Sequence, residues 1–174
     1  MRRAIVLALV LAVFCPTMAF GAVVNIGASD VKPISLSAVS GKDRVVALAN
    51  GSAEIVNALG LGGELVGRDI ASSAPELMKV PIVTAGHQIV AEKVISVKPT
   101  LVLIDASSGP VNAISLIRKS GIKVVSISEA WKLEDIARKV SEVSAALGRS
   151  DLGNSLNAKL SSAVGSARLN KKVK

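Results

Sequence analysis

The chain has 174 residues, of which 50% are hydrophobic and only 2% are aromatic. This length allows one domain with a substantial hydrophobic core and excludes two domains of ordinary size. The formal charge of +8 suits an anionic ligand or an anionic surface. Nucleic acid is not the expected partner, because the basic residues are scattered and the chain has no Tyr and a single Trp to stack on bases.

The first residues resemble a secretory signal peptide. Two arginines precede an apolar run that ends at Phe14, and small residues follow it. This pattern predicts a signal peptide over residues 1–21, so we expect the protein to be exported to the periplasm or to the outer face of the cytoplasmic membrane. Lipid attachment at Cys15 is the less favoured alternative, because the residue before a lipidated cysteine is normally small, and here it is Phe14. Since Cys15 is the only cysteine, the chain can form neither an internal disulfide nor a cysteine metal site.

Strand and helix patterns alternate from Arg44 onward, after an irregular leader over residues 22–43. Because the core must consist of Val, Ile, Leu and Ala, the composition favours buried parallel strands covered by helices. The alternation predicts βαβ units with right-handed crossovers. We therefore expect an α/β fold: a single Rossmann-like lobe over residues 44–148, with a mostly parallel sheet flanked by helices. Strands are predicted over residues 44–49, 64–69, 81–85, 100–105 and 123–128, and helices over residues 52–60, 91–97, 110–121 and 133–148.

Residues 149–174 carry a narrow apolar stripe. Leu152, Leu156, Leu160 and Val164 recur every four residues, with polar side chains between them. This spacing predicts a long helix that lies along a surface or bridges two bodies. Its basic end is expected to be a solvated tail.

Ligands of open α/β sheets bind at the carboxyl ends of the strands, where loops lead into helices. His87, the only histidine, lies in a loop of this kind and not inside a core strand. Taken alone, a single histidine is more often a hydrogen-bonded residue without a function of its own. The loops expected at this edge are residues 50–54, 68–76, 84–92, 105–112 and 128–135.

Enzyme sites do not assemble well from these loops. The chain has no G-x-S-x-G motif, and its glycines lack the spacing of a nucleotide-binding loop. His87 and Glu92 alone would make a poor zinc or iron site, because a metal ion needs several convergent ligands. A ligand that carries its own metal, such as haem, needs only one or two protein donors. We therefore expect a binding protein and not an enzyme.

Four stretches resemble, in the right order, the substrate-binding proteins of bacterial haem-import ABC transporters. Within the wider group that also binds cobalamin and iron siderophores, the similarity is greatest to the haemin-binding branch. Its most specific part is T-x-G-H at residues 84–87, followed by A-E at 91–92 and K-P-T-L-V at 98–102. The four stretches are residues 44–69, 80–105, 107–125 and 128–136.

The resemblance implies a role for particular residues. His87 of the T-x-G-H loop would be an axial ligand of the iron of haem, the transported ligand, and Gly86 would line the same site. Glu92 would dock this lobe onto basic residues of an ABC transporter permease. The alternative for Glu92 is a purely local role, since a carboxylate in the first turn of a helix is favourable by about 0.3–1 kcal/mol without any partner.

Three further residues stand at the same edge. Arg68 is a candidate partner for a haem propionate, because a guanidinium pairs well with a carboxylate, but an ordinary surface position is the alternative. Trp131 is a candidate for stacking on a flat macrocycle, although a role in closing the edge of the core is favoured. Glu54 is expected to be a first-turn helix carboxylate.

The chain departs from these proteins in one respect. They have two lobes joined by a long helix, and the haem-binding members commonly take a tyrosine ligand from the second lobe. This chain has no Tyr, and residues 149–174 resemble the start of the interlobe helix. The sequence leaves open a truncated or split product, or a lobe completed by a second-lobe partner or by a second copy. A siderophore or corrinoid cargo and an inactive single-lobe remnant are the competing hypotheses.

Overall fold

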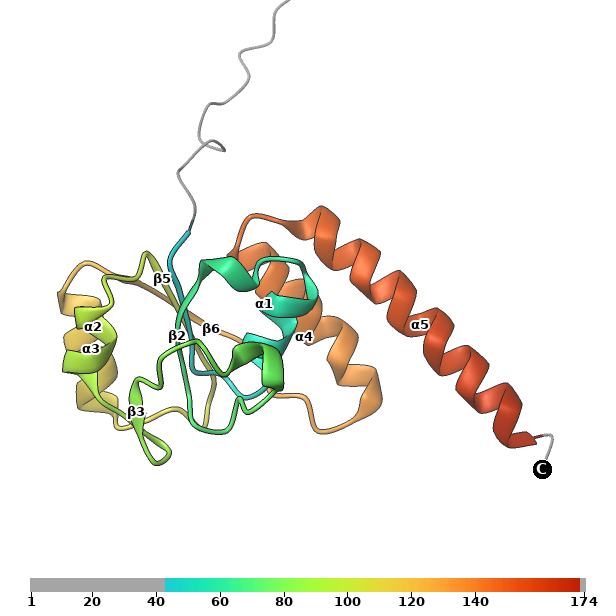
Figure 1. The fold of residues 1–174 in the computed structure, drawn as a ribbon, viewed down its shortest axis with the longest axis horizontal. Helices are drawn as coiled ribbons and strands as arrows, with labels where there is room; N and C mark the ends of the chain where they lie inside the picture. The colour runs from blue at the N-terminus through green and yellow to red at the C-terminus, as the bar shows by residue number, and fades with distance from the viewer. Residues whose placement is uncertain (1–42, 173–174) are drawn as a thin grey trace, which may run out of the picture. The chain divides into compact units, whose positions relative to one another are not determined.

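The structure is a computed structural model that describes residues 43–172. All described residues belong to one compact unit, residues 37–174 (Figure 1). The predicted signal peptide, Cys15 and nearly all of the predicted leader therefore lie outside the described residues.

The described part contains a four-stranded parallel sheet in the order β2-β1-β5-β6. The strands are β1 (Val45–Ala47), β2 (Leu65–Arg68), β5 (Leu101–Ile104) and β6 (Lys123–Ser126). Every residue of the two central strands β1 and β5 is buried. Strands that are covered on both faces require continuous apolar runs, which is why these segments are built from Val, Leu, Ile and Ala. The predicted α/β fold with a mostly parallel sheet is confirmed.

Helices cover both faces of this sheet. Figure 1 shows α2 (Ala91–Ser96) and α3 (Val111–Lys119) on one face, and α1 (Ser52–Ala58) and α4 (Leu133–Ala146) on the other. Two short 3-10 helices, η2 (Gly62–Glu64) and η3 (Pro75–Leu77), lie in the loops around β2. Successive residues of β1 enter different cores: Val45 and Ala47 pack in the cluster that contains Val143 of α4, and Val46 packs with Ile117 of α3.

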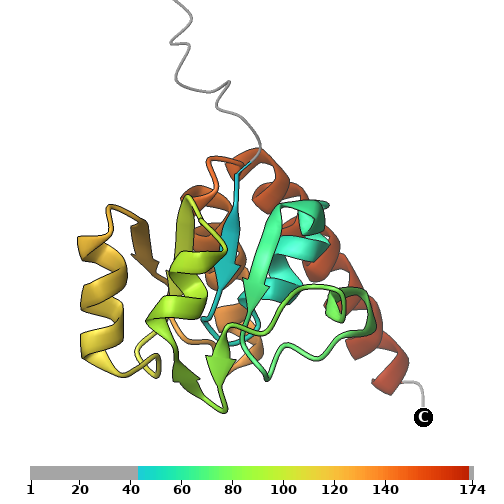
Figure 2. The same cartoon turned by 60° about the vertical axis from the view of Figure 1, so that its left-hand side comes forward.

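The prediction of a sheet strand over residues 81–85 is wrong, because this segment is not a strand of the main sheet. Ile82 forms only an isolated bridge with Arg68. The chain then enters a separate antiparallel hairpin of β3 (Thr84–Ala85) and β4 (Gln88–Ile89). Gly86, with φ of 56°, reverses the chain, so β3 pairs with β4 and not with the sheet. Figure 2 shows this hairpin at the edge toward which the arrows of β1 and β2 point.

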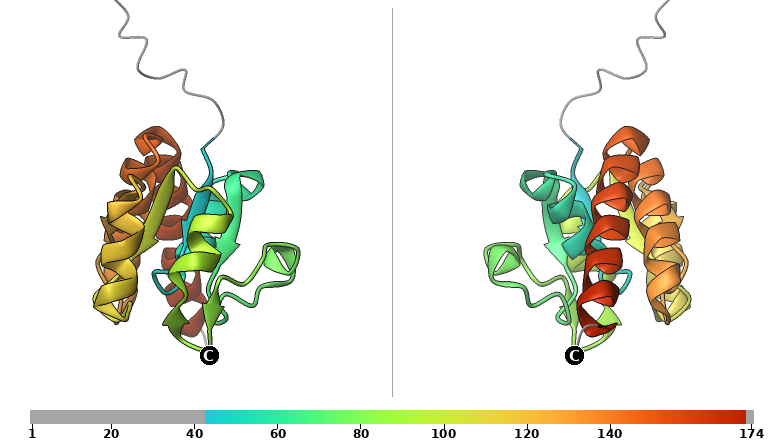
Figure 3. Two further views of the ribbon diagram at one scale, coloured as in Figure 1. Left: turned by 90° about the vertical axis from the view of Figure 1, so that its left-hand side faces the viewer. Right: turned by 90° about the vertical axis from the view of Figure 1, so that its right-hand side faces the viewer.

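The predicted C-terminal helix is α5 (Ser150–Lys172), which packs beside α4 (Figure 3). Leu152 and Leu156 of the predicted apolar stripe pack against the core cluster on this face of the sheet. The helices approach closely at Gly153, where an added Cβ would overlap the Ser144 side chain. Within residues 43–172, none of the helices has the length and hydropathy needed to cross a membrane.

Candidate functional site

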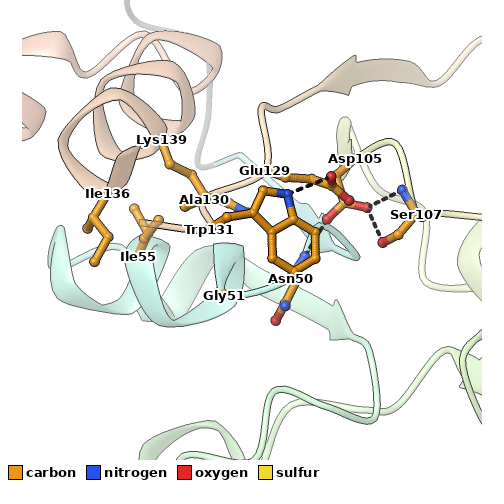
Figure 4. A pocket seen from close by; sticks show the side chains of 10 residues that line it. All are labelled: Asn50, Gly51, Ile55, Asp105, Ser107, Glu129, Ala130, Trp131, Ile136 and Lys139. Atoms are coloured by element: carbon orange, nitrogen blue, oxygen red, sulfur yellow. Dashed lines mark hydrogen bonds between the residues drawn. The ribbon is translucent and has the colours of Figure 1, made fainter. Parts of the chain in front are cut away.

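Two adjoining pockets lie at the carboxyl ends of the strands. The first, here called the tryptophan pocket, has a volume of about 330 Å³ (Figure 4). The second, here called the histidine pocket, has a volume of about 280 Å³. Asn50 and Ser107 line both pockets, so these residues separate one from the other. The tryptophan pocket is lined by residues that include Ile55, Asp105, Glu129, Trp131, Ile136 and Lys139. The histidine pocket is lined by residues that include Leu48, Asp69, Thr84, His87, Ile89 and Ser108.

All five loops that were predicted to meet at this edge contribute to the two pockets. Four of the loops follow strands of the sheet. The fifth, residues 84–92, contains the β3–β4 hairpin. Parallel strands bring their carboxyl ends to one edge, so loops that are far apart in the sequence converge there. The five loops therefore converge at one edge of the sheet, as the sequence predicted.

Asp105, the residue after β5, organises the boundary between the pockets. It is 4% exposed, and its carboxylate accepts hydrogen bonds from the Asn50 backbone N–H at 2.8 Å and from the Ser107 hydroxyl at 2.7 Å. The Ser107 backbone N–H and the Ser108 hydroxyl donate to the same carboxylate at 3.1 and 3.0 Å. Asp105 was not predicted as a site residue, although an Asp followed by two serines after a buried strand indicates an Asx-type turn.

The hydrogen bonds of Asp105 also determine its ionisation. Burial by itself would raise the pKa of this carboxyl group. The hydrogen bonds from Ser107, Asn50 and Ser108, with a weaker attraction to the Lys139 ammonium, outweigh burial and lower the pKa below its ordinary value of 3.8. Asp105 is therefore a carboxylate at neutral pH.

His87 occupies the tip of the β3–β4 hairpin. The turn consists of Gly86 and His87, and only Gly86 has a positive φ, which is the pattern of a type II′ turn. The hairpin is anchored by the Ile89 N–H, which donates to the Gly109 carbonyl at 2.8 Å. The His87 side chain is exposed, lines the histidine pocket and makes no hydrogen bond within residues 43–172. Its ring nitrogens are thus available to a ligand.

The structure does not place Arg68 where the sequence suggested. Arg68 is 4% exposed, and its guanidinium lies inside the loop that follows β2. Its Nε atom donates to the carbonyl oxygens of Leu77 and Val80, both at 3.0 Å. Its Nη1 atom donates to those of Ser72 at 2.9 Å and Asp69 at 3.2 Å. The prediction that Arg68 lines the ligand is wrong, because its donors satisfy the backbone of this loop.

Trp131 is more exposed than expected, whereas Arg68 is more buried than expected. Its side chain is 81% exposed, so it does not close the edge of the core. The indole lies over the tryptophan pocket, and its Nε1–H donates to the Glu129 carboxylate at 3.2 Å (Figure 4). The backbone N–H of Trp131 donates to Asp135 at 3.3 Å, which attaches this loop to the first turn of α4. The position is compatible with stacking on a flat ligand.

The two glutamates at this edge have different surroundings. Glu54 lies in the first turn of α1, as predicted, and also accepts a hydrogen bond from the Ser72 hydroxyl at 3.3 Å. Glu92 lies in the first turn of α2, is exposed, and has no hydrogen bond or ion pair among the described residues. Both hypotheses for Glu92, docking and a local effect on the helix, are compatible with this position.

Lys139 is a second residue that the sequence analysis did not identify. It belongs to α4, is 5% exposed and lines the tryptophan pocket. A signal was present in the sequence, since Lys139 shares the helical spacing of the buried Val140 and Val143 and therefore occupies the core-facing side. Among residues 43–172, no cluster of three or more histidine, cysteine or carboxylate side chains is placed to hold a metal ion.

Comparison with known proteins places this geometry in context. A family model described as periplasmic binding protein matches residues 45–172. Among solved structures, the periplasmic heme-binding protein RhuT from Roseiflexus sp. RS-1, in its apo form, is 32% identical to this chain and superimposes with a TM-score of 0.66. The similarity covers 74% of this chain and 49% of RhuT.

Two curated relatives are also similar in sequence. An uncharacterized ABC transporter substrate-binding lipoprotein, YvrC of Bacillus subtilis (strain 168), is 28% identical over 130 residues, or 69% of this chain and 41% of YvrC. A vitamin B12-binding protein of Vibrio vulnificus (strain YJ016) is 30% identical over 103 residues, or 59% of this chain and 37% of that protein. The chain thus spans less than half of the length of the relatives that it matches.

Proposed function

This chain belongs to the periplasmic binding protein family, and we propose that it binds haem outside the cytoplasmic membrane for an ABC-type importer. Proteins of this family deliver substrates to ABC transporters and are not enzymes, in agreement with the sequence-based expectation. In the proposed mechanism, a ring nitrogen of neutral His87 coordinates the haem iron as an axial ligand, and no covalent chemistry is involved.

The observation that carries this proposal is the position of His87. The imidazole is exposed at the tip of an anchored hairpin, borders a pocket, and has no hydrogen-bond partner among the described residues. An exposed imidazole that its own protein does not engage leaves a ring nitrogen for a ligand. A single nitrogen donor is sufficient for haem, because the porphyrin already supplies the equatorial ligands of the iron. Gly86 places the ring at the tip by adopting the positive φ of the turn.

The similarity to RhuT supports haem as the cargo. RhuT is described as a heme-binding protein, and its similarity covers most of the lobe that contains both pockets. Asn50 and Ser107 line both pockets. A haem held by His87 would therefore extend over these two residues toward the exposed indole of Trp131. Trp131 would then contact the porphyrin face or edge.

Glu92 is the proposed contact to the permease. Its carboxylate is exposed at the start of α2 and is not neutralised by another described residue. A carboxylate in such a position is available to pair with a basic residue of a membrane partner. Its docking role is independent of the haem contact, so Glu92→Gln is expected to reduce transport while haem affinity remains unchanged.

We further propose that export depends on the predicted signal peptide over residues 1–21, with attachment at Cys15 as the less favoured alternative. The second face of the haem would be covered by another lobe or by a second copy of the chain. This part of the proposal is motivated by the relatives, which are more than twice as long as the matched segment.

A corrinoid is the second candidate cargo, because one curated relative is described as a vitamin B12-binding protein and is 30% identical over 103 residues. A corrin already holds its metal in a macrocycle, as a porphyrin does, and would also suit the exposed Trp131. The two cargoes differ in their dependence on His87. Corrinoid binding does not require an axial protein nitrogen, so His87→Ala would leave corrinoid affinity intact.

The test is a titration of the purified protein with haemin, followed through the Soret band, for the native protein and for His87→Ala. We expect saturable one-to-one binding with a shifted band, and loss of the shifted band in the variant. Gln88→Ala is the matched control, because Gln88 is exposed in the same hairpin and should leave the spectrum unchanged. Equal and unsaturable spectra for all three proteins would contradict the proposal, and saturable cobalamin binding by His87→Ala would favour the corrinoid.

A further inference from the structure

The tryptophan pocket is lined by a cation, Lys139, that has no hydrogen-bond partner among the described residues. Lys139 is 5% exposed, and its side chain extends from α4 toward the loop of Trp131 (Figure 4). Its ammonium makes no hydrogen bond and no ion pair within residues 43–172. An ammonium has three hydrogen-bond donors and no acceptor. Any further acceptor for Lys139 must therefore come from the contents of the pocket.

The carboxylates that line the same pocket are already engaged. Asp105 accepts from Asn50, Ser107 and Ser108, and its attraction to Lys139 acts without an ion-pair contact. Glu129 accepts from the Trp131 Nε1–H at 3.2 Å. Within the described part of the chain, no ion pair within 4 Å joins Lys139 to Asp105 or to Glu129. Asp105 thus offsets part of the cost of burying the Lys139 charge and leaves the ammonium donors free.

The remaining walls of the pocket are apolar. Ile55 and Ile136 line it beside the Trp131 indole, and Ile136 and Trp131 are exposed. A group that fits such a site has a short apolar stem and ends in an oxygen acceptor. The pocket adjoins the histidine pocket through Asn50 and Ser107, so one ligand can occupy both.

We propose that the tryptophan pocket binds a carboxylate arm of the ligand whose metal His87 coordinates, with Lys139 as the donor and Trp131 covering the stem of the arm. This inference rests on the proposed function and extends it to the ligand class: a metal macrocycle that carries a free carboxylate on a short saturated chain. Haem has two such arms at one edge of the ring. Because Lys139 is only 5% exposed, the bond between its ammonium and a carboxylate is stronger than at a fully exposed surface.

Glu129 would repel the carboxylate arm of the ligand. Its substitution therefore has a predicted direction of effect on ligand affinity. Its carboxylate lies in the same pocket and would repel the carboxylate of the ligand. Glu129→Gln removes the repulsion and keeps an acceptor for the Trp131 Nε1–H. We therefore expect Glu129→Gln to tighten the binding of a carboxylate ligand severalfold, whereas Lys139→Met weakens it.

The experiment compares haemin with haemin dimethyl ester, in which both carboxylates are masked, on the native protein, Lys139→Met and Glu129→Gln. Dissociation constants are measured through the Soret band in one solvent. Lys139→Met should weaken haemin binding by about 10- to 100-fold and leave the diester within about threefold. Equal effects of Lys139→Met on the two ligands, or no effect on either, would overturn the inference.

Two controls keep this result separate from that of the proposed function. His87→Ala should abolish the shifted Soret band for haemin and diester alike, because the iron is unchanged in the diester. A His87-dependent band without any Lys139 effect on haemin affinity would refute only the carboxylate arm, whereas absence of any saturable band in the native protein would refute both. Far-UV circular dichroism verifies that Lys139→Met is folded. If it is not, a haemin affinity for Glu129→Gln that does not exceed the native value overturns the inference.

Discussion

The carboxylate of Asp105, which follows β5, accepts a hydrogen bond of 2.8 Å from the backbone N–H of Asn50, which follows β1. This bond joins two loops that are 55 residues apart in the sequence. Asn50 and the neighbouring Ser107 line both pockets, so Asp105 holds in place the residues that separate the histidine pocket from the tryptophan pocket. Its role is positional, because its own side chain is buried.

We expect Asp105→Asn to lower the free energy of unfolding by about 1–3 kcal/mol, because an amide has one acceptor oxygen and adds two donors opposite existing donors. Urea denaturation measures this difference. Glu76→Gln is the control, since Glu76 is an exposed carboxylate and its substitution should change stability by less than about 0.5 kcal/mol. Equal stabilities for the two variants would mean that the Asp105 hydrogen bonds contribute no net stability.

The lowered pKa of Asp105 predicts a pH dependence. A group whose pKa is lower in the folded than in the unfolded protein contributes stability above its unfolded pKa, and this contribution is lost as pH falls through the folded pKa. The Asp105 contribution should therefore be complete at neutral pH and decline below about pH 4. The stability difference between the native protein and Asp105→Asn, measured by urea denaturation, should shrink as pH falls from about 4 toward the lowered pKa of folded Asp105. A difference that stays constant over this range would contradict the assignment.

Arg68 should be important for stability and not for the ligand. Its guanidinium donates to four backbone carbonyls from a buried position, and a lysine ammonium cannot reproduce this planar arrangement. We expect Arg68→Lys to cost about 2–3 kcal/mol in urea denaturation, with haemin affinity of the folded variant unchanged. Arg118→Lys, at an exposed position of α3, should change neither quantity. A selective loss of haemin affinity in a stable Arg68→Lys protein would restore the discarded prediction that Arg68 contacts the ligand.

Two glycines of α5 should respond to alanine in opposite directions. At Gly153 a Cβ would overlap the Ser144 side chain of α4, so Gly153→Ala should destabilise the protein by about 1–3 kcal/mol through separation of the two helices. At Gly165 a Cβ would meet no atom within 4 Å, so Gly165→Ala should stabilise the same helix by up to about 1 kcal/mol. Thermal unfolding of the two variants measures both shifts. A stabilising Gly153→Ala would show that α4 and α5 do not pack in this way.

Local sequence patterns were sufficient to predict the architecture. The alternation of apolar strands and amphipathic helices predicted the parallel sheet and its helices, and the four-residue spacing of Leu152 and Leu156 predicted α5. The placement of His87 at the carboxyl edge of the sheet also followed from the sequence. These features depend on periodicity within one element and on the rule that parallel strands end at the same edge of a sheet. Neither depends on the side chains of other elements.

The exposure of individual side chains was decided only by the tertiary structure. Arg68 is buried because the loop after β2 folds over its guanidinium, and Trp131 is exposed because its loop lies at the mouth of a pocket and not over the core. Residues 81–85 have the composition of a strand, yet the turn at Gly86 pairs Thr84 and Ala85 with the next segment. Lys139 lines the tryptophan pocket together with residues from three other parts of the chain. Sequence periodicity determines which face a residue occupies, whereas exposure depends on what packs against that face, and this is a property of distant residues.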